Sequence, residues 1–311
     1  MRLNSIVLFA ASAMAQCALK RTDTISVTGS APGFAYGVTG GGDATPVYPT
    51  NTSHLIDLLG SDEPQVIIVD RTYDFIGTEG TTKGTICKSW GSFEDGCQAI
   101  IDTGSGCGDT GSESYEWDTA GVTGIYVHSN KTIIGVGSEG VLLGKGLRMV
   151  DVSNIIVQNI MITDLNPKLV WGDNYIYRTS GRSPALSGST LFHAVNSVWE
   201  NNNGHAIEGT DNGQGLFEGC VFNNVSQIVV DGFVGQLFSS SGGTANKACY
   251  DYLGRDCVGN IQVNDGSSFT KADTGFFSNF TGLNIASPSA ASAAQTSVPT
   301  NAGNTLQNGL S

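Results

Sequence analysis

The sequence predicts an all-β protein that winds as a right-handed parallel β-helix. Three observations predict this fold: short segments rich in β-branched residues recur between Gly and Asn residues, no apolar pattern with the period of a helix runs for long, and the recurrence is just above twenty residues. Ile133 and Ile155 are 22 residues apart, and Ile155 and Ile176 are 21 apart. Such a period, with strands of about three to five residues, is typical of a solenoid.

The expected strands follow one another along the chain without long helical segments between them. They span residues 66–69, 124–127, 132–136, 141–143, 154–162, 175–177, 191–199, 216–225 and 228–230. Several are apolar at consecutive positions, as in Ile155-Ile156-Val157, which is typical of a parallel sheet covered on much of its surface. Asn130, Asn154 and Asn174 stand just before such runs, where Asn tolerates left-handed backbone and can form stacked ladders.

A two-sheet sandwich is the alternative fold. It requires regular alternation of apolar and polar residues, with turn pairs such as Asn-Gly between matched strands. Alternation is poor in this chain, and its few Asn-Gly and Asp-Gly pairs do not separate matched strands. We therefore favour the β-helix.

Composition limits the classes of partner. Charged residues make up 14% of the 311 residues, and 28 acidic against 15 basic groups give a net charge of -13. A surface of this sign repels phosphates and carboxylates, so we expect no nucleic acid and no membrane as partner. The 40% of hydrophobic residues excludes a disordered chain.

The amino terminus predicts secretion to the extracellular space. Arg2 precedes an apolar run over residues 6–14, and Ala13-Met14-Ala15 has the small-x-small form of a signal-peptidase site, so residues 1–15 are a signal peptide. Lys20-Arg21 is either a dibasic processing site or merely a charged pair. Residues 22–286 then form the solenoid domain, and the Ser-, Ala- and Asn-rich residues 287–311 form a weakly ordered tail draped on it.

The cysteines indicate an oxidising compartment. Cleavage after Arg21 would remove Cys17 and leave an even number of cysteines: Cys87, Cys97, Cys107, Cys220, Cys249 and Cys257. None lies in a C-x-x-C metal or redox motif, so we expect disulfides, and spacing alone selects no pairing. Asn-x-Ser/Thr acceptors at Asn51, Asn130, Asn224 and Asn279 are consistent with a glycoprotein.

A series of motifs connects the chain to a known family. They include residues 33–42 (GFAYGVTGGG), 80–90, 130–135 (NKTIIG), 144–148 (GKGLR), 163–168 (TDLNPK), 179–184 (TSGRSP), 191–196 (LFHAVN), 204–206 (GHA) and 253–257 (LGRDC). In this order, from about Gly29 to Ala286, they resemble the secreted fungal pectin lyases of the pectate lyase superfamily. The resemblance implies a monomeric β-helix that cuts pectin, a methyl-esterified galacturonan, by endo β-elimination without a cofactor and leaves unsaturated oligosaccharides.

One departure from the family pattern concerns the active site. The family continues through several coils after its Val-Trp-Gly motif, whereas here Trp171-Gly172-Asp173 runs directly into Asn174. The absent block normally holds a second active-site arginine, an aspartate and further aromatic subsites. Asp173 is either that aspartate or part of a turn. The missing coils have two open origins, a deletion that a solenoid tolerates or a gene model that skips an exon.

The resemblance nominates Arg182 as the base that removes the proton next to the ester carbonyl. A guanidinium normally stays protonated, so it needs a shielded cleft and a nearby positive charge to act as a base. The family also has a lysine three residues further on, where this chain has Ala185. Trp171 and Trp90 align with cleft tryptophans that stack on sugar rings, although Trp90 could instead cap a coil. Trp117 and Trp199 are assigned to packing.

The resemblance also implies the disulfide pairs Cys87–Cys107, Cys97–Cys220 and Cys249–Cys257. Two other functions stay open: a catalytically dead β-helix that binds pectin, and a calcium-dependent pectate lyase. De-esterified pectate is a polyanion that a chain with a charge of -13 repels unless calcium bridges them, and no row of Asp or Glu suited to calcium is visible. We therefore expect pectin as the substrate and no metal.

Overall fold

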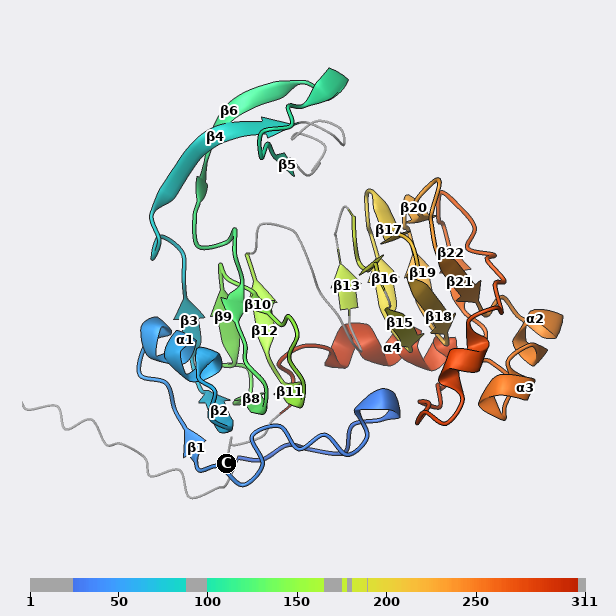
Figure 1. Cartoon of the computed structure of the whole chain (residues 1–311), viewed down its shortest axis with the longest axis horizontal. Helices are drawn as coiled ribbons and strands as arrows, with labels where there is room; N and C mark the ends of the chain where they lie inside the picture. The colour runs from blue at the N-terminus through green and yellow to red at the C-terminus, as the bar shows by residue number, and fades with distance from the viewer. Residues whose placement is uncertain (1–24, 88–99, 165–174, 178–180, 189, 307–311) are drawn as a thin grey trace, which may run out of the picture.

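The computed structural model describes residues 25–87, 100–164, 175–177, 181–188 and 190–306. Short strands follow one another in successive coils, and each pairs in parallel with the equivalent strand of a neighbouring coil (Figure 1). The expected parallel β-helix is confirmed by this pairing. Successive paired strands such as Val198–Glu200 and Val221–Asn223 begin at a spacing close to the period read from the sequence.

The described strands of the N-terminal coils form three parallel sheets around an aliphatic core. The first sheet contains β1 (Pro46–Val47), β2 (Gln65–Val69), β8 (Lys131–Gly135) and β11 (Ile155–Gln158); the second contains β3 (Thr72–Asp74), β9 (Val141–Leu143) and β12 (Met161–Thr163); the third contains β7 (Ile125–Tyr126) and β10 (Leu147–Arg148). Ile67, Ile133 and Leu142 are almost fully buried between them. Helix α1 (Thr52–Gly60), capped by the Asn51 side chain, packs Leu55 and Leu59 onto this core.

The described strands of the C-terminal coils form three further parallel sheets. They are β13 (Tyr175–Tyr177) with β16 (Val198–Glu200), β19 (Val221–Asn223) and β22 (Ile261–Val263); β14 (Ala185–Leu186) with β17 (His205–Gly209) and β20 (Gln227–Val229); and β15 (Leu191–Val195) with β18 (Gln214–Glu218) and β21 (Gln236–Ser239). This core is aromatic: Trp199 stacks on Phe222 with ring centroids 4.7 Å apart, and Phe217 packs against Trp199 at 6.1 Å. Trp199 therefore packs in the core, as expected.

Asparagine ladders form where the sequence places them. Asn130 and Asn154 both have left-handed backbone, with φ of 60° and 58°. The Asn154 side-chain amide donates to the Asn130 side-chain oxygen at 2.8 Å. Asn201 and Asn224 repeat the contact at 2.7 Å in the C-terminal coils. Asn174, the third expected position, lies outside the described residues.

An antiparallel unit departs from the expected solenoid. Strands β4 (Thr81–Cys87), β5 (Ile100–Ile101) and β6 (Ser112–Asp118) pair with one another and project from the N-terminal coils (Figure 1). The ring of Trp117 lies directly over Gly84, where a Cβ atom would stand 2.6 Å from it. This aromatic contact is the packing role expected of Trp117.

Two of the three implied disulfides lie in the part of the chain that is described. Cys87–Cys107 crosses the antiparallel unit, and Cys249–Cys257 joins the short helices α2 (Gly243–Lys247) and α3 (Tyr250–Leu253) to the turn that follows them. Cys220 is fully buried, but Cys97 lies outside the described residues, so the pairing of these two stays a prediction.

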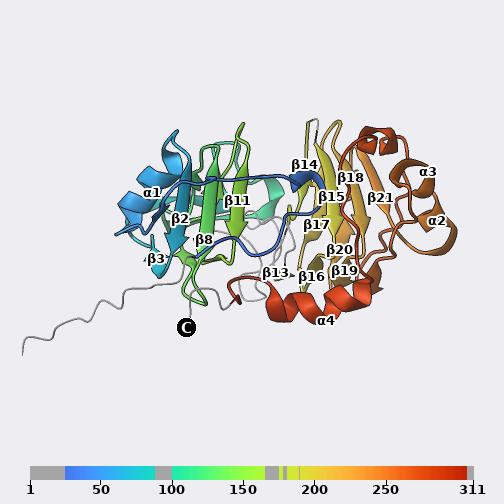
Figure 2. The same cartoon turned by 90° about the horizontal axis from the view of Figure 1, so that it is seen from below.

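The described parallel sheets fall into two groups, one on each side of residues 165–174. Among the described strands, none from β1 to β12 pairs with one from β13 to β22. Two segments bridge the two groups of coils instead (Figure 2). We call residues 25–45 the N-terminal strap and residues 284–306 the C-terminal strap.

The N-terminal strap contacts both groups of coils. Ile25 is buried at 5% exposure against the first sheet. At the other end of the strap, the short turn η1 (Gly33–Ala35) accepts a hydrogen bond from the Asn284 side chain at 2.8 Å, and Phe34 stacks on Phe280 of η4 (Phe277–Phe280). This segment therefore links the first coils to the last.

The C-terminal strap differs from the weakly ordered tail expected from its composition. It contains helix α4 (Ala291–Asn301), which buries Ala291 and Ala294 on β16 and β19. Beyond the helix, the Asn304 side chain donates to the Ser138 carbonyl at 2.6 Å, and the Leu306 amide donates to the Asn159 side chain at 2.8 Å. Small alanines let the helix lie close to the sheet, a contact that low-complexity composition does not reveal.

The described residues contain no helix that is long and apolar enough to span a membrane.

Candidate active site

Arg182 lies in a tight turn that leads into β14. Its φ of 56° is in the left-handed region. The turn is fastened to the next coil by backbone hydrogen bonds, because the Ser183 amide donates to the Ala206 carbonyl at 2.8 Å and the Glu208 amide donates to the Pro184 carbonyl at 3.0 Å. The register Ala185 to Glu208 extends this pairing into β14 and β17. The backbone around Arg182 is therefore set by the coil that contains β17.

The aromatic core supports the same turn from inside. The indole N–H of Trp199 donates to the Ser183 carbonyl at 2.5 Å, and both residues are nearly fully buried. Leu186, the second residue of β14, has no exposed surface. The turn thus rests on packed side chains, while Arg182 itself points outward with 51% of its side chain exposed.

A carboxylate holds the Arg182 side chain. The Nε of Arg182 lies 2.7 Å from Oε1 of Glu208. The second oxygen of Glu208, Oε2, lies 2.7 Å from Nε2 of His205, whose side chain is 11% exposed. Glu208 and His205 both belong to β17, so this strand provides backbone and side-chain contacts to the turn.

The charges around Arg182 have a direct chemical consequence. A guanidinium is a cation near neutral pH, and it can bind an anionic or polar oxygen through its N–H donors. To act as a base it must first give up a proton. Its charged neighbour in the described structure is the carboxylate of Glu208, whereas the family resemblance implies a second cation beside it. Ala185, in place of the family's lysine, is a half-buried residue of β14.

Of the residues expected to act on or bind the substrate, the described part of the chain contains only Arg182. Trp171, Trp90 and Asp173 lie outside the described residues, so the stacking platform beside Arg182 stays a prediction. Glu208 and the link through His205 were missed by the sequence analysis. The coil period contains the signal for them, because Glu208 lies one coil beyond Ala185 and two residues after the Gly204-His205-Ala206 motif.

Among the described residues, no group of three or more His, Cys, Asp or Glu side chains is arranged to hold a metal ion. The expectation that the reaction needs no metal stays a prediction.

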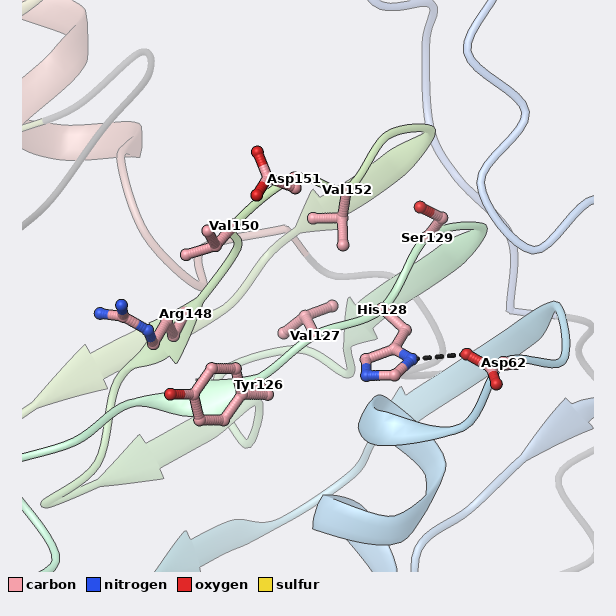
Figure 3. A pocket seen from close by; sticks show the side chains of 9 residues that line it. All are labelled: Asp62, Tyr126, Val127, His128, Ser129, Arg148, Val150, Asp151 and Val152. Atoms are coloured by element: carbon pink, nitrogen blue, oxygen red, sulfur yellow. Dashed lines mark hydrogen bonds and ion pairs between the residues drawn. The ribbon is translucent and has the colours of Figure 1, made fainter. Parts of the chain in front are cut away.

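A separate cavity of about 310 Å³ lies on the N-terminal coils, at the turns that follow β7 and β10 (Figure 3). Arg148 lies over the Tyr126 ring, 5.5 Å from its centroid. On the other side of the cavity, His128 Nδ1 lies 2.7 Å from an oxygen of Asp62. These basic groups are therefore engaged with partners in the cavity wall, and none of the residues nominated from the sequence lines it.

Comparison with known proteins decides the family. The chain is 47% identical to a probable pectin lyase E of Aspergillus niger, with 90% of this chain and 95% of the relative covered. It is 45% identical to a probable pectin lyase C of Emericella nidulans, over 93% and 97% of the two chains. This chain belongs to the fungal pectin lyase family. A third member, pectin lyase B of Emericella nidulans, is 40% identical over 97% and 99%.

The chain was also compared with protein-family models and with solved structures. No protein-family model matches the chain. Among solved structures, the match to a thermostable pectate lyase covers 88% of this chain and 97% of that protein. The TM-score is 0.48 and the sequences are 14% identical.

The alignment with the pectin lyase of Aspergillus niger is longer than the chain itself. It runs over 355 residues, whereas the chain has 311. This pectin lyase therefore contains residues that have no counterpart in the present chain.

Proposed function

We propose that this chain is a secreted pectin lyase in which Arg182 is the catalytic base. The observation that carries the proposal is the placement of Arg182, outward-facing on a turn fixed by β17 and Trp199, in a chain up to 47% identical to named pectin lyases. In the reaction, a base takes the proton next to the ester carbonyl. The electrons of that C–H bond form the new double bond, and the glycosidic oxygen leaves with its bonding pair and takes a proton from solvent.

The net charge of -13 supports pectin over pectate as the substrate, because a methylated polymer is neutral and is not repelled. We propose that Trp171 and Trp90 stack on its sugar rings, which predicts a higher KM for Trp171→Ala and Trp90→Ala. We also propose that the enzyme acts as a monomer and without a metal.

We infer that the residues missing relative to the family fall after Trp171. Two observations support this position. None of the described strands up to β12, which ends at Thr163, pairs with one from β13, which begins at Tyr175, onward. The motifs shared with the family are continuous on either side of this interval. A solenoid tolerates such a loss because each coil contacts only its neighbours. Sequencing the transcript across Trp171 and Asn174 tests the inference; a spliced message that encodes additional coils there would show that the gene model is short.

The activity is tested with highly methylated pectin, by following the ultraviolet absorbance of the unsaturated product with and without a chelator. We expect absorbance to grow in both conditions. Growth that the chelator abolishes would indicate a calcium-dependent pectate lyase, and polymer binding without growth would indicate a catalytically dead binding module.

A matched pair of variants tests the base. Arg182→Ala is expected to abolish product formation. Arg71→Ala is its control, because Arg71 is similarly exposed at 56% and its Nε likewise contacts a carboxylate, that of Asp70 at 2.9 Å. Activity that survives Arg182→Ala would show that another group removes the proton.

A further inference from the structure

The contact between Arg182 and Glu208 occupies only one edge of the guanidinium. Nε lies 2.7 Å from Oε1, at ion-pair distance. The terminal nitrogens of the guanidinium carry further N–H donors beyond the one on Nε. A carboxylate on Nε can therefore orient the group while the terminal nitrogens act on the substrate.

The carboxylate is itself fixed on both sides. Oε2 of Glu208 lies 2.7 Å from Nε2 of His205, which is mostly buried. With each oxygen bound to a different partner, the carboxylate plane cannot rotate freely. The Glu208 backbone is fixed as well, since its amide donates to the Pro184 carbonyl two residues beyond Arg182. One residue thus holds both the turn and the side chain that the turn presents.

Arg182 needs such a support. Its side chain is long, has many rotamers and is half exposed, so solvent alone would not keep it in one position. The side-chain contact described for it is the ion pair with Glu208 of β17, while the backbone of the turn after it is held by β17 and Trp199 through Ser183 and Pro184. Reaction rates depend steeply on the placement of a catalytic group, and a misplacement of about 1 Å can cost on the order of 100-fold.

We propose that Glu208 is a positioning residue for Arg182, with His205 fixing the orientation of its carboxylate. This inference rests on the proposed function of Arg182. It concerns how the Arg182 guanidinium is held in place, and the assignment of Arg182 as the base is taken from that proposed function.

The experiment compares Glu208→Ala, Glu208→Gln and the wild type in the pectin assay. Glu208→Ala removes the carboxylate that pairs with Nε, and we expect kcat to fall about 10- to 100-fold with little change in KM. Glu208→Gln keeps a carbonyl oxygen that can accept from Nε, and we expect it to restore most of the lost kcat. Asp70→Ala, which removes the corresponding carboxylate from Arg71, is the control and should leave kcat unchanged.

A second measurement does not depend on activity. The Arg182 Nε–H signal in a ¹H–¹⁵N NMR spectrum can be assigned by its absence in Arg182→Lys. We expect a signal distinct from those of free arginines in the wild type and in Glu208→Gln, and its loss or return to the free position in Glu208→Ala. The remaining backbone spectrum shows whether each variant is folded.

The outcomes separate the two claims. If the wild type forms no unsaturated product, the proposed function fails, and the NMR comparison alone then decides whether Glu208 holds Arg182. An unchanged Nε–H signal in Glu208→Ala would overturn the positioning role. A lost signal with unchanged kcat would also overturn it, because the contact would then exist without serving catalysis.

Discussion

A buried carboxylate far from Arg182 in the sequence offers a sharp test of what stabilises the C-terminal coils. Glu218, at the end of β18, has no exposed surface. Its two oxygens accept hydrogen bonds from Arg255 at 2.6 and 2.8 Å and from the Val258 amide at 3.0 Å, and His193 Nε2 lies 2.7 Å away. Burial by itself raises the pKa of Glu218, but the bonds from Arg255 and His193 outweigh it, so the pKa is lowered from its ordinary value.

Glu218→Ala removes the acceptor and leaves its partners in place. The His193 side chain is only 4% exposed, so it loses its hydrogen bond without gaining water. Arg255 retains 24% exposure and its bond to the Ala286 carbonyl at 2.7 Å, which reduces the penalty. Breaking a buried pair from one side costs about 3–5 kcal/mol, and the exposure of Arg255 places this case near 3. Because the unfolding entropy grows with chain length, the melting temperature of a domain of this size should fall by about 5 °C.

The stabilisation by Glu218 also depends on pH in a defined direction. Because the pKa of Glu218 is lowered in the folded protein, its contribution is present above the unfolded-state pKa of about 4.3 and is lost as the pH falls through the folded-state value. The difference in unfolding free energy between wild type and Glu218→Ala should be large at pH 6 and should shrink toward pH 3.

Denaturation followed by circular dichroism measures both effects. Glu116→Ala is the control, because it breaks the pair with Lys83, in which both side chains are exposed and the contribution to stability is small. This account of Glu218 would be refuted if Glu218→Ala and the control had the same melting temperature at pH 6. It would also be refuted if the difference in unfolding free energy from the wild type grew as the pH falls.

Two further predictions concern other parts of the fold. Lys131 is fully buried, its pKa is lowered by burial, and its Nζ donates to the carbonyls of Ser61, Glu63 and Ser129 at 2.8, 2.8 and 3.0 Å. Lys131→Met leaves these carbonyls without their donor and should lower the unfolding free energy in urea by about 2–4 kcal/mol. Lys83→Met is the control, because this lysine is 77% exposed and its loss should change stability very little; equal losses of stability would contradict the prediction. Removal of residues 287–311 takes away α4 and the bonds to Ser138 and Asn159, so unfolding should become less cooperative than after removal of 307–311 alone. A single unchanged transition would argue against a bridging role for the C-terminal strap.

Much of the solenoid could be predicted from the sequence because its signals are local. The period of the β-branched runs follows from the length of one coil, and the Asn residues before the runs follow from the left-handed turns that they occupy. The antiparallel unit β4–β6 was not predicted, since its alternation is weak and Trp117 covers a glycine far away in the sequence. Helix α4 was missed because its alanines stabilise it only through contact with β16 and β19.

For the candidate site, the sequence nominates Arg182 but not the residues that contact it. Motif resemblance nominates single residues, and Arg182 lies in the Thr-Ser-Gly-Arg-Ser-Pro motif. Its partner Glu208 belongs to the next coil, so finding it requires the register between β14 and β17. That register depends on the pairing of short strands, which the spacing of the motifs suggests but does not fix to a single residue.

The contacts of Arg182 show how much of an active site a single neighbouring coil can support. In a solenoid, each coil contacts only the coils before and after it. The described support of Arg182 comes from the coil after it, through Glu208, His205 and the backbone of β17. Loss of the preceding coils would leave these contacts intact while removing the second arginine that the family resemblance places there. Lyase activity that requires both Arg182 and Glu208 would therefore mean that the following coil alone suffices to position the base.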